Sequence, residues 1–418
     1  NLRTWTLSVW LKRGKLSSEQ RIFGTYKSGV SQVGNIDWST GGAGDVVYWH
    51  AGGASNFRSY PSMMHRDPSA WYHLVCTFDT TDSTQADRMK WYVNGERLTD
   101  FSDAGEVTSI NYDGLVNIDE EHVIGANRLY ANFLDGYMAE MHFIDGTALT
   151  PSSFGETGDY GEWKPIKVSG LTYGTNGFYL DFSDSAALGD DAAGSNDWTV
   201  VGLTAADQML DTPTNNFCTW NPATKPANTN TLSEGNLKAN SSADWSGRFG
   251  TIAVTSGKWY WEISEGDWSD SEMSMQVGIA VDTIDQDAQT HHTLAGSIAY
   301  QANGQIRVDN SVTDTVTSYD QGTDIVGVAL DLDSGTNTVK FYENNNLVAT
   351  KDLTANFTGK AVVPFAGAYQ HYWMANFGQD SSFAGAKTAQ GNQDDNDIGD
   401  FYYEPPTGYL ALCTSNLP

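Results

Sequence analysis

The stretch that decides the fold runs from Trp71 to Phe101, WYHLVCTFDTTDSTQADRMKWYVNGERLTDF. Its pattern is typical of three consecutive β-strands, because apolar and polar side chains alternate. The first strand places Tyr72, Leu74, Cys76 and Phe78 on one face, and the second places Met89, Trp91 and Val93 on one face. Asn94-Gly95 then supplies the positive φ that a two-residue hairpin turn requires. We therefore predict an antiparallel meander over this stretch.

A second stretch with the same pattern lies far away in the chain, from Asp324 to Lys351, DIVGVALDLDSGTNTVKFYENNNLVATK. Its apolar faces are formed by Val326, Val328, Leu330 and Leu332, and then by Val339 and Phe341. Asn344-Asn345-Asn346 supplies the last turn. Two distant meanders predict an all-β fold, with two antiparallel β-sandwiches of jelly-roll type joined by a β-containing connector.

Length and charge restrict the classes of function. The chain has 418 residues, which is long for one sandwich and sufficient for two. Its 52 acidic and 23 basic residues give a net charge of -29. Such a surface is soluble and repels phosphate backbones, so we expect no nucleic-acid partner. No apolar run approaches the ~18 residues of a membrane span.

The cysteines and the N-terminus carry further expectations. Cys76, Cys218 and Cys413 include no CxxC pair, and Cys76 lies on an apolar strand face. We expect a buried thiol there and no disulfide framework. The chain begins at Asn1 in strand-like sequence without a signal peptide, so we expect it to begin inside a longer polypeptide.

The remaining pattern predicts three segments. Residues 1–212 form the first sandwich with its closing strands and connector, residues 213–383 form the second sandwich, and residues 384–418 form an extended tail. In the connector, strands are expected over 177–182 and 198–201, and Pro151 opens a short helical turn. The tail is apolar and aromatic, so it should pack either on its own domain or on a neighbouring subunit.

Two family resemblances follow from particular motifs. The segment from Asn1 to about Thr150 resembles the laminin-G/concanavalin-like jelly roll. The motifs that carry this resemblance are WTLSVWLKRG, WYHLVCTFD, KWYVNGERL and VIGANR with FLDGYMAEMHFIDGTAL. The segment from about Asn216 to Phe383 resembles a SPRY domain. The motifs that carry this resemblance are SGKWYWEI, MQVGIA, the second meander, VVPFAGAY and ANFGQ. The resemblance to the laminin-G/concanavalin-like jelly roll departs at the start of the chain, where the first strand of that family is not found.

The tandem arrangement is similar to that of large tailed-phage proteins, mostly marine. This resemblance implies a non-enzymatic virion surface protein (a fibre, spike or decoration protein) exposed on an extracellular particle. Its expected partners are other virion proteins, further copies of itself in a homo-oligomer such as a trimer, and a host-surface glycan. A secreted cellular adhesin is an alternative.

One motif raises a catalytic alternative. Glu265-Gly-Asp267-Trp-Ser-Asp270 is similar to the E-x-D-x-x-E strand of laminarinase-type glycoside hydrolases, in which carboxylates of one strand line up over the sugar. The third position is aspartate, one methylene short, and the surrounding Gly and Ser favour a loop. We therefore predict that the protein is not an enzyme.

Clustered acidic residues raise the question of calcium. Asp190-Asp191 with Asn196-Asp197 could hold Ca²⁺ through hard oxygen ligands, and no other cofactor is expected. Solvated acidic turns also explain this pattern, as they explain Asp331 to Asn337.

The remaining candidates are binding residues, because aromatic rings stack on sugar C–H faces while polar groups bind the hydroxyls. The candidates are Tyr48, Trp49, His50 and Arg58, beside Tyr60; Asp267, Trp268 and Asp270; and Tyr369, His371 and Trp373. Large aromatic residues of strands are usually packed, so Trp49 and Trp373 could instead belong to the cores.

Overall fold

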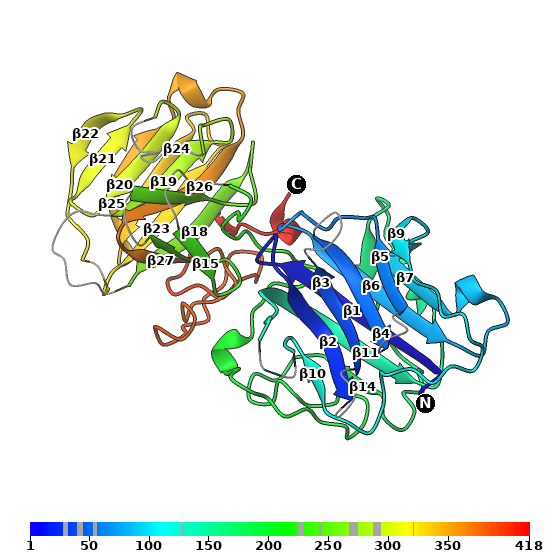
Figure 1. Ribbon diagram of the computed structural model, residues 1–418. Helices are drawn as coiled ribbons and strands as arrows, with labels where there is room; N and C mark the ends of the chain where they lie inside the picture. The colour runs from blue at the N-terminus through cyan, green and yellow to red at the C-terminus, as the bar shows by residue number, and fades with distance from the viewer. Residues whose placement is uncertain are drawn as a thin grey trace. The chain divides into compact units, whose positions relative to one another are not determined.

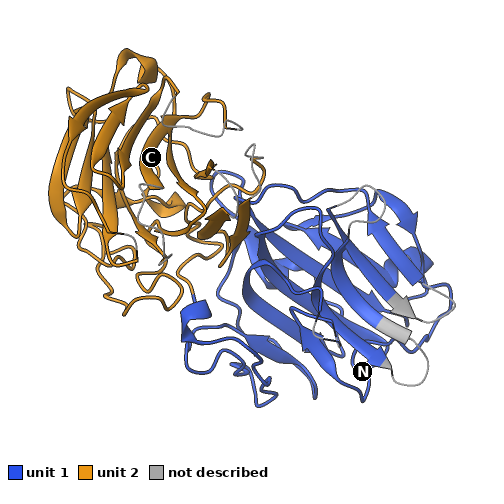
Figure 2. Cartoon of the chain, turned by 60° about the vertical axis from the view of Figure 1, so that its left-hand side comes forward, with its two compact units in different colours: residues 1–208 blue, residues 209–418 orange. Residues whose placement is uncertain are grey.

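The computed structural model describes residues 1–27, 32–39, 45–52, 57–127, 129, 131–224, 230–241, 245–266, 275–286, 294–320 and 322–418. They form two compact units, Asn1–Gln208 and Met209–Pro418 (Figure 2). Both units consist of mainly antiparallel β-sheets (Figure 1), so the all-β prediction is confirmed. Within these ranges, no helix is long and apolar enough to cross a membrane.

Unit 1 contains two six-stranded sheets. Sheet A has the order β14 (Phe178–Leu180), β11 (Gly136–Asp145), β1 (Thr4–Arg13), β6 (Trp71–Asp79), β7 (Met89–Val93) and β8 (Glu96–Arg97). Sheet B has the order β10 (His122–Ile124), β2 (Gln20–Lys27), β3 (Gln32–Ser39), β4 (Val46–Gly52), β5 (Phe57–Pro61) and β9 (Phe101–Ala104). A separate ladder pairs β12 (Gly155–Thr157) with β13 (Trp163–Pro165), and short 3-10 turns lie at Gln85–Asp87, Pro151–Ser153 and Ala205–Asp207.

The facing sides of sheets A and B enclose the core of unit 1. The alternating apolar residues of β1 and β6 lie in it, as predicted for β6, together with four fully buried tryptophans: Trp5, Trp38, Trp49 and Trp91. The turn after β7 has φ +48° at Asn94 and +82° at Gly95, as the hairpin prediction requires. The first meander is therefore one wall of a packed sandwich.

Unit 2 also contains two main sheets. Sheet C has the order β15 (Asn230–Ser233), β16 (Lys238–Ser241), β27 (Tyr372–Asn376), β18 (Lys258–Glu265), β23 (Ile325–Asp331), β24 (Thr338–Glu343) and β25 (Asn346–Asp352), with β28 (Leu410–Ala411) parallel to β18. Sheet D has the order β17 (Trp245–Phe249), β26 (Val362–Tyr369), β19 (Met275–Val281), β20 (Ser297–Gln301), β21 (Gln305–Val308) and β22 (Ser311–Thr315). Short 3-10 turns lie at Ala355–Phe357 and Thr414–Asn416.

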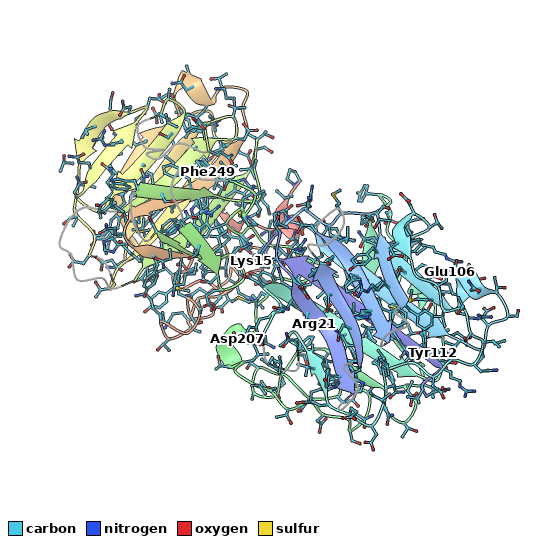
Figure 3. The ribbon with its side chains drawn as sticks, in the orientation of Figure 1. Lys15, Arg21, Glu106, Tyr112, Asp207 and Phe249 are labelled. Carbon is cyan, nitrogen blue, oxygen red and sulfur yellow. The ribbon has the colours of Figure 1, made fainter. Side chains whose placement is uncertain are left out.

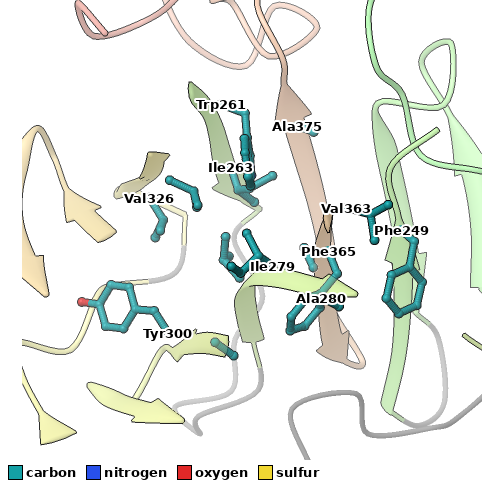
Figure 4. Packing of buried hydrophobic residues seen from close by; sticks show 14 of the residues in the cluster. Phe249, Trp261, Ile263, Ile279, Ala280, Tyr300, Val326, Val363, Phe365 and Ala375 are labelled. Carbon is teal, nitrogen blue, oxygen red and sulfur yellow. The ribbon is translucent and has the colours of Figure 1, made fainter. Parts of the chain in front are cut away.

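The core of unit 2 joins sheets C and D. Figure 4 shows Trp261 and Ile263 of β18 packed with Ile279 of β19 and with Val326 of β23. The second meander thus lies in a different unit and a different sheet from the first.

The C-terminal tail packs on its own unit, against the side of sheet C that faces away from this core. Phe401, Tyr409 and Ala411 lie with Tyr260 in a small buried cluster. The Glu262 carboxylate fixes the tail further, because it accepts hydrogen bonds from the backbone N–H groups of residues 402 (2.8 Å) and 403 (2.7 Å).

One strand prediction is wrong. Residues 198–201 form no strand: Trp198 packs on Phe178 at 5.0 Å between ring centroids, but Val201 is 67% exposed. The edge beyond β14 is instead occupied by another segment, since the Ala192 N–H donates to the Tyr179 carbonyl (2.8 Å). The short turn at Pro151 is confirmed.

Candidate functional site

The side of sheet B that faces away from the core carries a row of polar and aromatic side chains. Alternation along β4 sends Val47 and Trp49 into the core and Tyr48 and His50 outwards. His50 pairs across the sheet with Arg58, so both point outwards. We call Tyr48, His50, Arg58 and Tyr60 the Tyr48 row.

The rings of this row are nearly parallel. Tyr48 lies 4.3 Å from Tyr60, with 17° between their planes, and 6.0 Å from His50, with 25° between theirs. Burial raises the pKa of Tyr48, and the neighbouring Tyr60 adds to this shift, so the Tyr48 hydroxyl stays protonated at neutral pH. Half-buried rings with hydroxyl donors are suited to the C–H faces and hydroxyls of a sugar.

A buried ion pair lies beside the row, on the same face of sheet B. Arg21 of β2 (Figure 3) places Nε 2.8 Å from Oδ1 of Asp37, which is the cross-strand partner of Tyr48. Desolvation raises the pKa of Asp37 well above its usual range, against the opposing effect of Arg21. Arg58, by contrast, is exposed and is available to a ligand.

The structure brings together three of the predicted residues, Tyr48, His50 and Arg58. It places Trp49 elsewhere, because Trp49 is 1% exposed and packs in the core beside Trp5, with 5.3 Å between the ring centroids. Strand alternation explains this correction: Trp49 cannot share a face with both of its neighbours.

The second predicted set is dispersed. Tyr369 is 38% exposed at the end of β26, whereas Trp373 lies in the core of unit 2. His371 is also buried, with Nδ1 3.4 Å from Oε1 of Glu265. Trp373 and His371 therefore present no accessible surface to a ligand. The third set, Asp267, Trp268 and Asp270, lies outside the described residues.

A serine–histidine pair in unit 1 has a hydrogen bond in the wrong direction for nucleophilic catalysis. Ser8 Oγ lies 2.8 Å from Nε2 of His73, and the Trp163 indole N–H donates to Nδ1 of the same ring (2.9 Å). Nδ1 is therefore the acceptor, and the proton on Nε2 is donated to Ser8. A general base must accept the proton of the serine instead. Burial also lowers the pKa of His73 to about 3.

The acidic loop proposed for calcium is organised by the backbone. Asp191 accepts hydrogen bonds from the N–H groups of Tyr179 (2.9 Å), Ala193 (3.0 Å) and Asn196 (3.0 Å), and Asp197 accepts from the Asp191 N–H (3.0 Å). N–H donors occupy the oxygens that a cation would need, and Asp190 points to solvent. Among the residues with described positions, no three His, Cys, Asp or Glu side chains converge as a metal site.

Sequence reasoning missed Asp37 and Arg21. Asn35 and Asp37 alternate with Ile36 and Trp38, which is the pattern of a strand with one buried face. The run is short and contains Gly34, a residue type that is depleted in strands, so the sequence pattern did not indicate a strand here. A closer count of the alternation could have found β3.

Part of each unit matches the model of a known family. Residues 1–153 match the model of the concanavalin A-like lectin/glucanases superfamily, and residues 258–380 match that of the SPRY domain. Both domains are present in this chain. They suggest a role in binding or adhesion. The resemblances predicted from sequence motifs are thereby confirmed for the two domains.

Three solved structures are also similar to part of this chain. The SPRY domain of human HERC1 is 17% identical, with a TM-score of 0.32, and the match covers 37% of this chain and 96% of that chain. A human SPRY domain is 16% identical, with a TM-score of 0.28 and coverage of 35% and 93%. The TRIM65 PSpry domain is 14% identical, with a TM-score of 0.31 and coverage of 38% and 87%. No curated protein matches the chain.

Proposed function

We propose that this chain is a non-enzymatic surface protein of a tailed-phage virion, a fibre, spike or decoration protein, and that unit 1 binds a host-surface glycan through the Tyr48 row. The observation that carries the proposal is the outward row of near-parallel rings beside the exposed Arg58 guanidinium. Tandem binding domains and the net charge of -29, which disfavours nucleic acid, support this role.

A glycan array tests the receptor half of the proposal. The full chain should bind a limited set of glycans, and Tyr60→Ala and Arg58→Ala should each weaken binding about tenfold, the effect expected when a stacked ring or a charged hydrogen bond is lost. Tyr160→Ala is the matched control, because Tyr160 is 98% exposed and lies outside the row. Binding that survives both row substitutions would contradict the assignment of the face.

The virion half needs a separate measurement. Antibodies against this chain should label intact phage particles by electron microscopy, and the chain should copurify with particle proteins. Labelling of the host cell surface in uninfected cultures would instead favour a secreted adhesin. Copurification without glycan binding would leave contact between virion subunits as the role.

The non-enzymatic part of the proposal rests on Glu265. β18 ends at Glu265, and its carboxyl group faces the buried His371. A retaining hydrolase needs several carboxylates fixed along one strand over an open sugar site. We expect no reducing-sugar release from laminarin; release that is abolished by Glu265→Gln would establish the hydrolase alternative.

A further inference from the structure

One glutamate in a strand of sheet A has a backbone conformation that normally requires glycine. Glu140 of β11 has φ +49°. Between the pairs Ser8↔His142 and Trp10↔Ala139 the register shifts, so Glu140 and Met141 both lie opposite Val9 in a β-bulge. Every other non-glycine residue with positive φ in the described ranges lies outside the strands.

Such a conformation is unfavourable for a residue with a Cβ atom, and strained residues of this kind concentrate at functional sites. A glycine would form the same bulge without strain. The glutamate side chain is therefore the feature that needs an explanation.

The carboxylate of Glu140 is only partly used by the protein. Oε2 accepts a hydrogen bond from the Tyr179 hydroxyl (2.6 Å), and no partner of Oε1 is found in the described part of the chain. The side chain is 34% exposed. Glu140 thus presents a free carboxylate oxygen to solvent beside an aromatic ring.

The ring beside it is held rigidly. Tyr179 of β14 stacks on His142 with 4.1 Å between centroids and 9° between planes. His142 is buried, and its Nδ1 lies 2.9 Å from the Tyr173 hydroxyl. β14 is the edge strand of sheet A (Figure 1), and Tyr179 is half-buried there, beside the exposed Ala192, whose N–H donates to the Tyr179 carbonyl (2.8 Å).

The charge around this ring is negative. Asp181 follows directly after β14, two residues from Tyr179, and its carboxylate accepts hydrogen bonds from the Ser183 N–H and hydroxyl (3.0 Å each). The charged groups that shift the pKa of Tyr179 are Glu140 and Asp181, after the larger effect of burial. An anionic ligand would be repelled here, and an ammonium group would be attracted.

We propose that Tyr179, Glu140 and Asp181 form a second ligand site on sheet A that binds an amino sugar carrying a protonated amine. The Tyr179 ring contacts the C–H face of the sugar, the Glu140 carboxylate accepts hydrogen bonds from its amine and hydroxyls, and Asp181 adds negative charge that attracts the amine. This site does not depend on the Tyr48 row, which lies on sheet B.

Calorimetric titration of the full chain with a chitosan hexamer tests the site. Binding should weaken about tenfold or more in Glu140→Gln and in Tyr179→Ala, because a hydrogen bond to a charged group and a stacked ring are lost. Tyr160→Ala should bind as the wild type does. The N-acetylated hexamer, which lacks the positive charge, should bind at least about tenfold more weakly than chitosan.

A pair of variants separates binding from stability. Glu140→Gly and Glu140→Ala both remove the carboxylate, but only glycine relieves the strained φ. We expect Glu140→Gly to have the higher melting temperature of the two and both to lose chitosan binding.

Three outcomes would overturn the proposal: no binding of chitosan, equal affinity in Glu140→Gln, or equal affinity for the N-acetylated hexamer. Loss of binding in Tyr60→Ala but not in Tyr179→Ala would assign amino-sugar binding to the Tyr48 row. That result would remove the second site and leave the proposed function standing.

Discussion

Two glutamates of β18 lie three residues apart and have opposite environments. Glu262 accepts hydrogen bonds from two backbone N–H groups of the tail, from the Tyr260 hydroxyl (3.2 Å) and from the Asn376 amide (3.2 Å). Neither carboxyl oxygen of Glu265 has a hydrogen-bond partner in the described ranges, although His371 lies 3.4 Å away. Burial raises the pKa of both carboxyl groups, to about 7 for Glu262 and to about 8 for Glu265, but only Glu262 holds the tail through hydrogen bonds.

We expect Glu262→Ala to lower the free energy of unfolding of unit 2 by about 3–5 kcal/mol, since it leaves several buried donors unsatisfied. Glu262→Gln retains one acceptor oxygen and should lower the free energy of unfolding by less than Glu262→Ala does. Urea unfolding monitored by tryptophan fluorescence measures both variants. A loss below about 1 kcal/mol in Glu262→Ala, the net value of one ordinary hydrogen bond, would show that the tail is not held through this carboxylate.

Glu265 predicts a pH dependence. Burial raises its pKa from 4.5 to about 8. Between these values the folded protein retains a proton that the unfolded chain has lost, so the free energy of unfolding falls as pH rises through this window. Glu265→Gln should therefore be more stable than the wild type at pH 9, by about 2–4 kcal/mol, and nearly equal to it at pH 4. If the free energy of unfolding changed with pH in the same way in the two proteins, the raised pKa of Glu265 would not be the cause of the pH dependence.

At the scale of elements, the β12–β13 ladder is held on sheet A by Trp163. Its indole lies against Gly95, where an added Cβ would come within 2.6 Å of the ring. Gly95→Ala should destabilise unit 1 through both this clash and its φ of +82°. Gly161→Ala is the matched control, with φ +88° and nothing within 4 Å of an added Cβ.

We expect Gly95→Ala to cost about 1–3 kcal/mol more than Gly161→Ala, because only the former displaces a packed side chain. Trypsin cleavage after Lys167, which is exposed just beyond the end of β13, should accelerate in Gly95→Ala alone. Equal melting temperatures and equal cleavage rates would show that the contact with Trp163 contributes nothing beyond the strain of the turn.

Alternation predicts the elements well where one face of a strand is clearly apolar, as in β6 and β23. It fails for Tyr48-Trp49-His50, since three consecutive large residues do not show which one faces the core, and it fails for β3. The pair of Glu140 and Tyr179 has no sequence signal. These residues meet only because β11 pairs with β14, and the bulge that turns Glu140 outwards depends on the register with β1.

Across the whole molecule, the acidic surplus has a structural role besides solubility. Asp191, Asp331 and Asp394 each accept hydrogen bonds from backbone N–H groups of their own loops. Asp331 also pairs with Lys258 (3.0 Å), and hydrogen bonds from Ser334 and Lys258 outweigh desolvation and lower its pKa to about 2. A chain rich in turns and poor in helices needs such acceptors, because its loop N–H groups lack partners in a ladder.

The extent of unit 2 exceeds the SPRY match, which ends at residue 380. Its first and last segments pair with each other: the Cys218 N–H donates to the Leu412 carbonyl (3.0 Å), and Phe217 bridges to Cys413. Asp394 accepts a hydrogen bond from the Ala411 N–H (2.8 Å), which fixes β28 beside β18. The segments outside the match therefore complete the buried surface of sheet C.

We accordingly expect the fragment 209–418 to fold cooperatively and the fragment 258–380 to remain unfolded. The shorter fragment lacks β15, β16, β17 and the tail, so it exposes Tyr260 and leaves the Glu262 carboxylate without the N–H groups of residues 402 and 403. A fragment 209–400 should fold but unfold at lower urea than 209–418, because it loses only the tail contacts. Dispersed NMR spectra and a cooperative transition for 258–380 would show instead that the matched region is a self-sufficient domain and that the flanking segments are additions to a complete core.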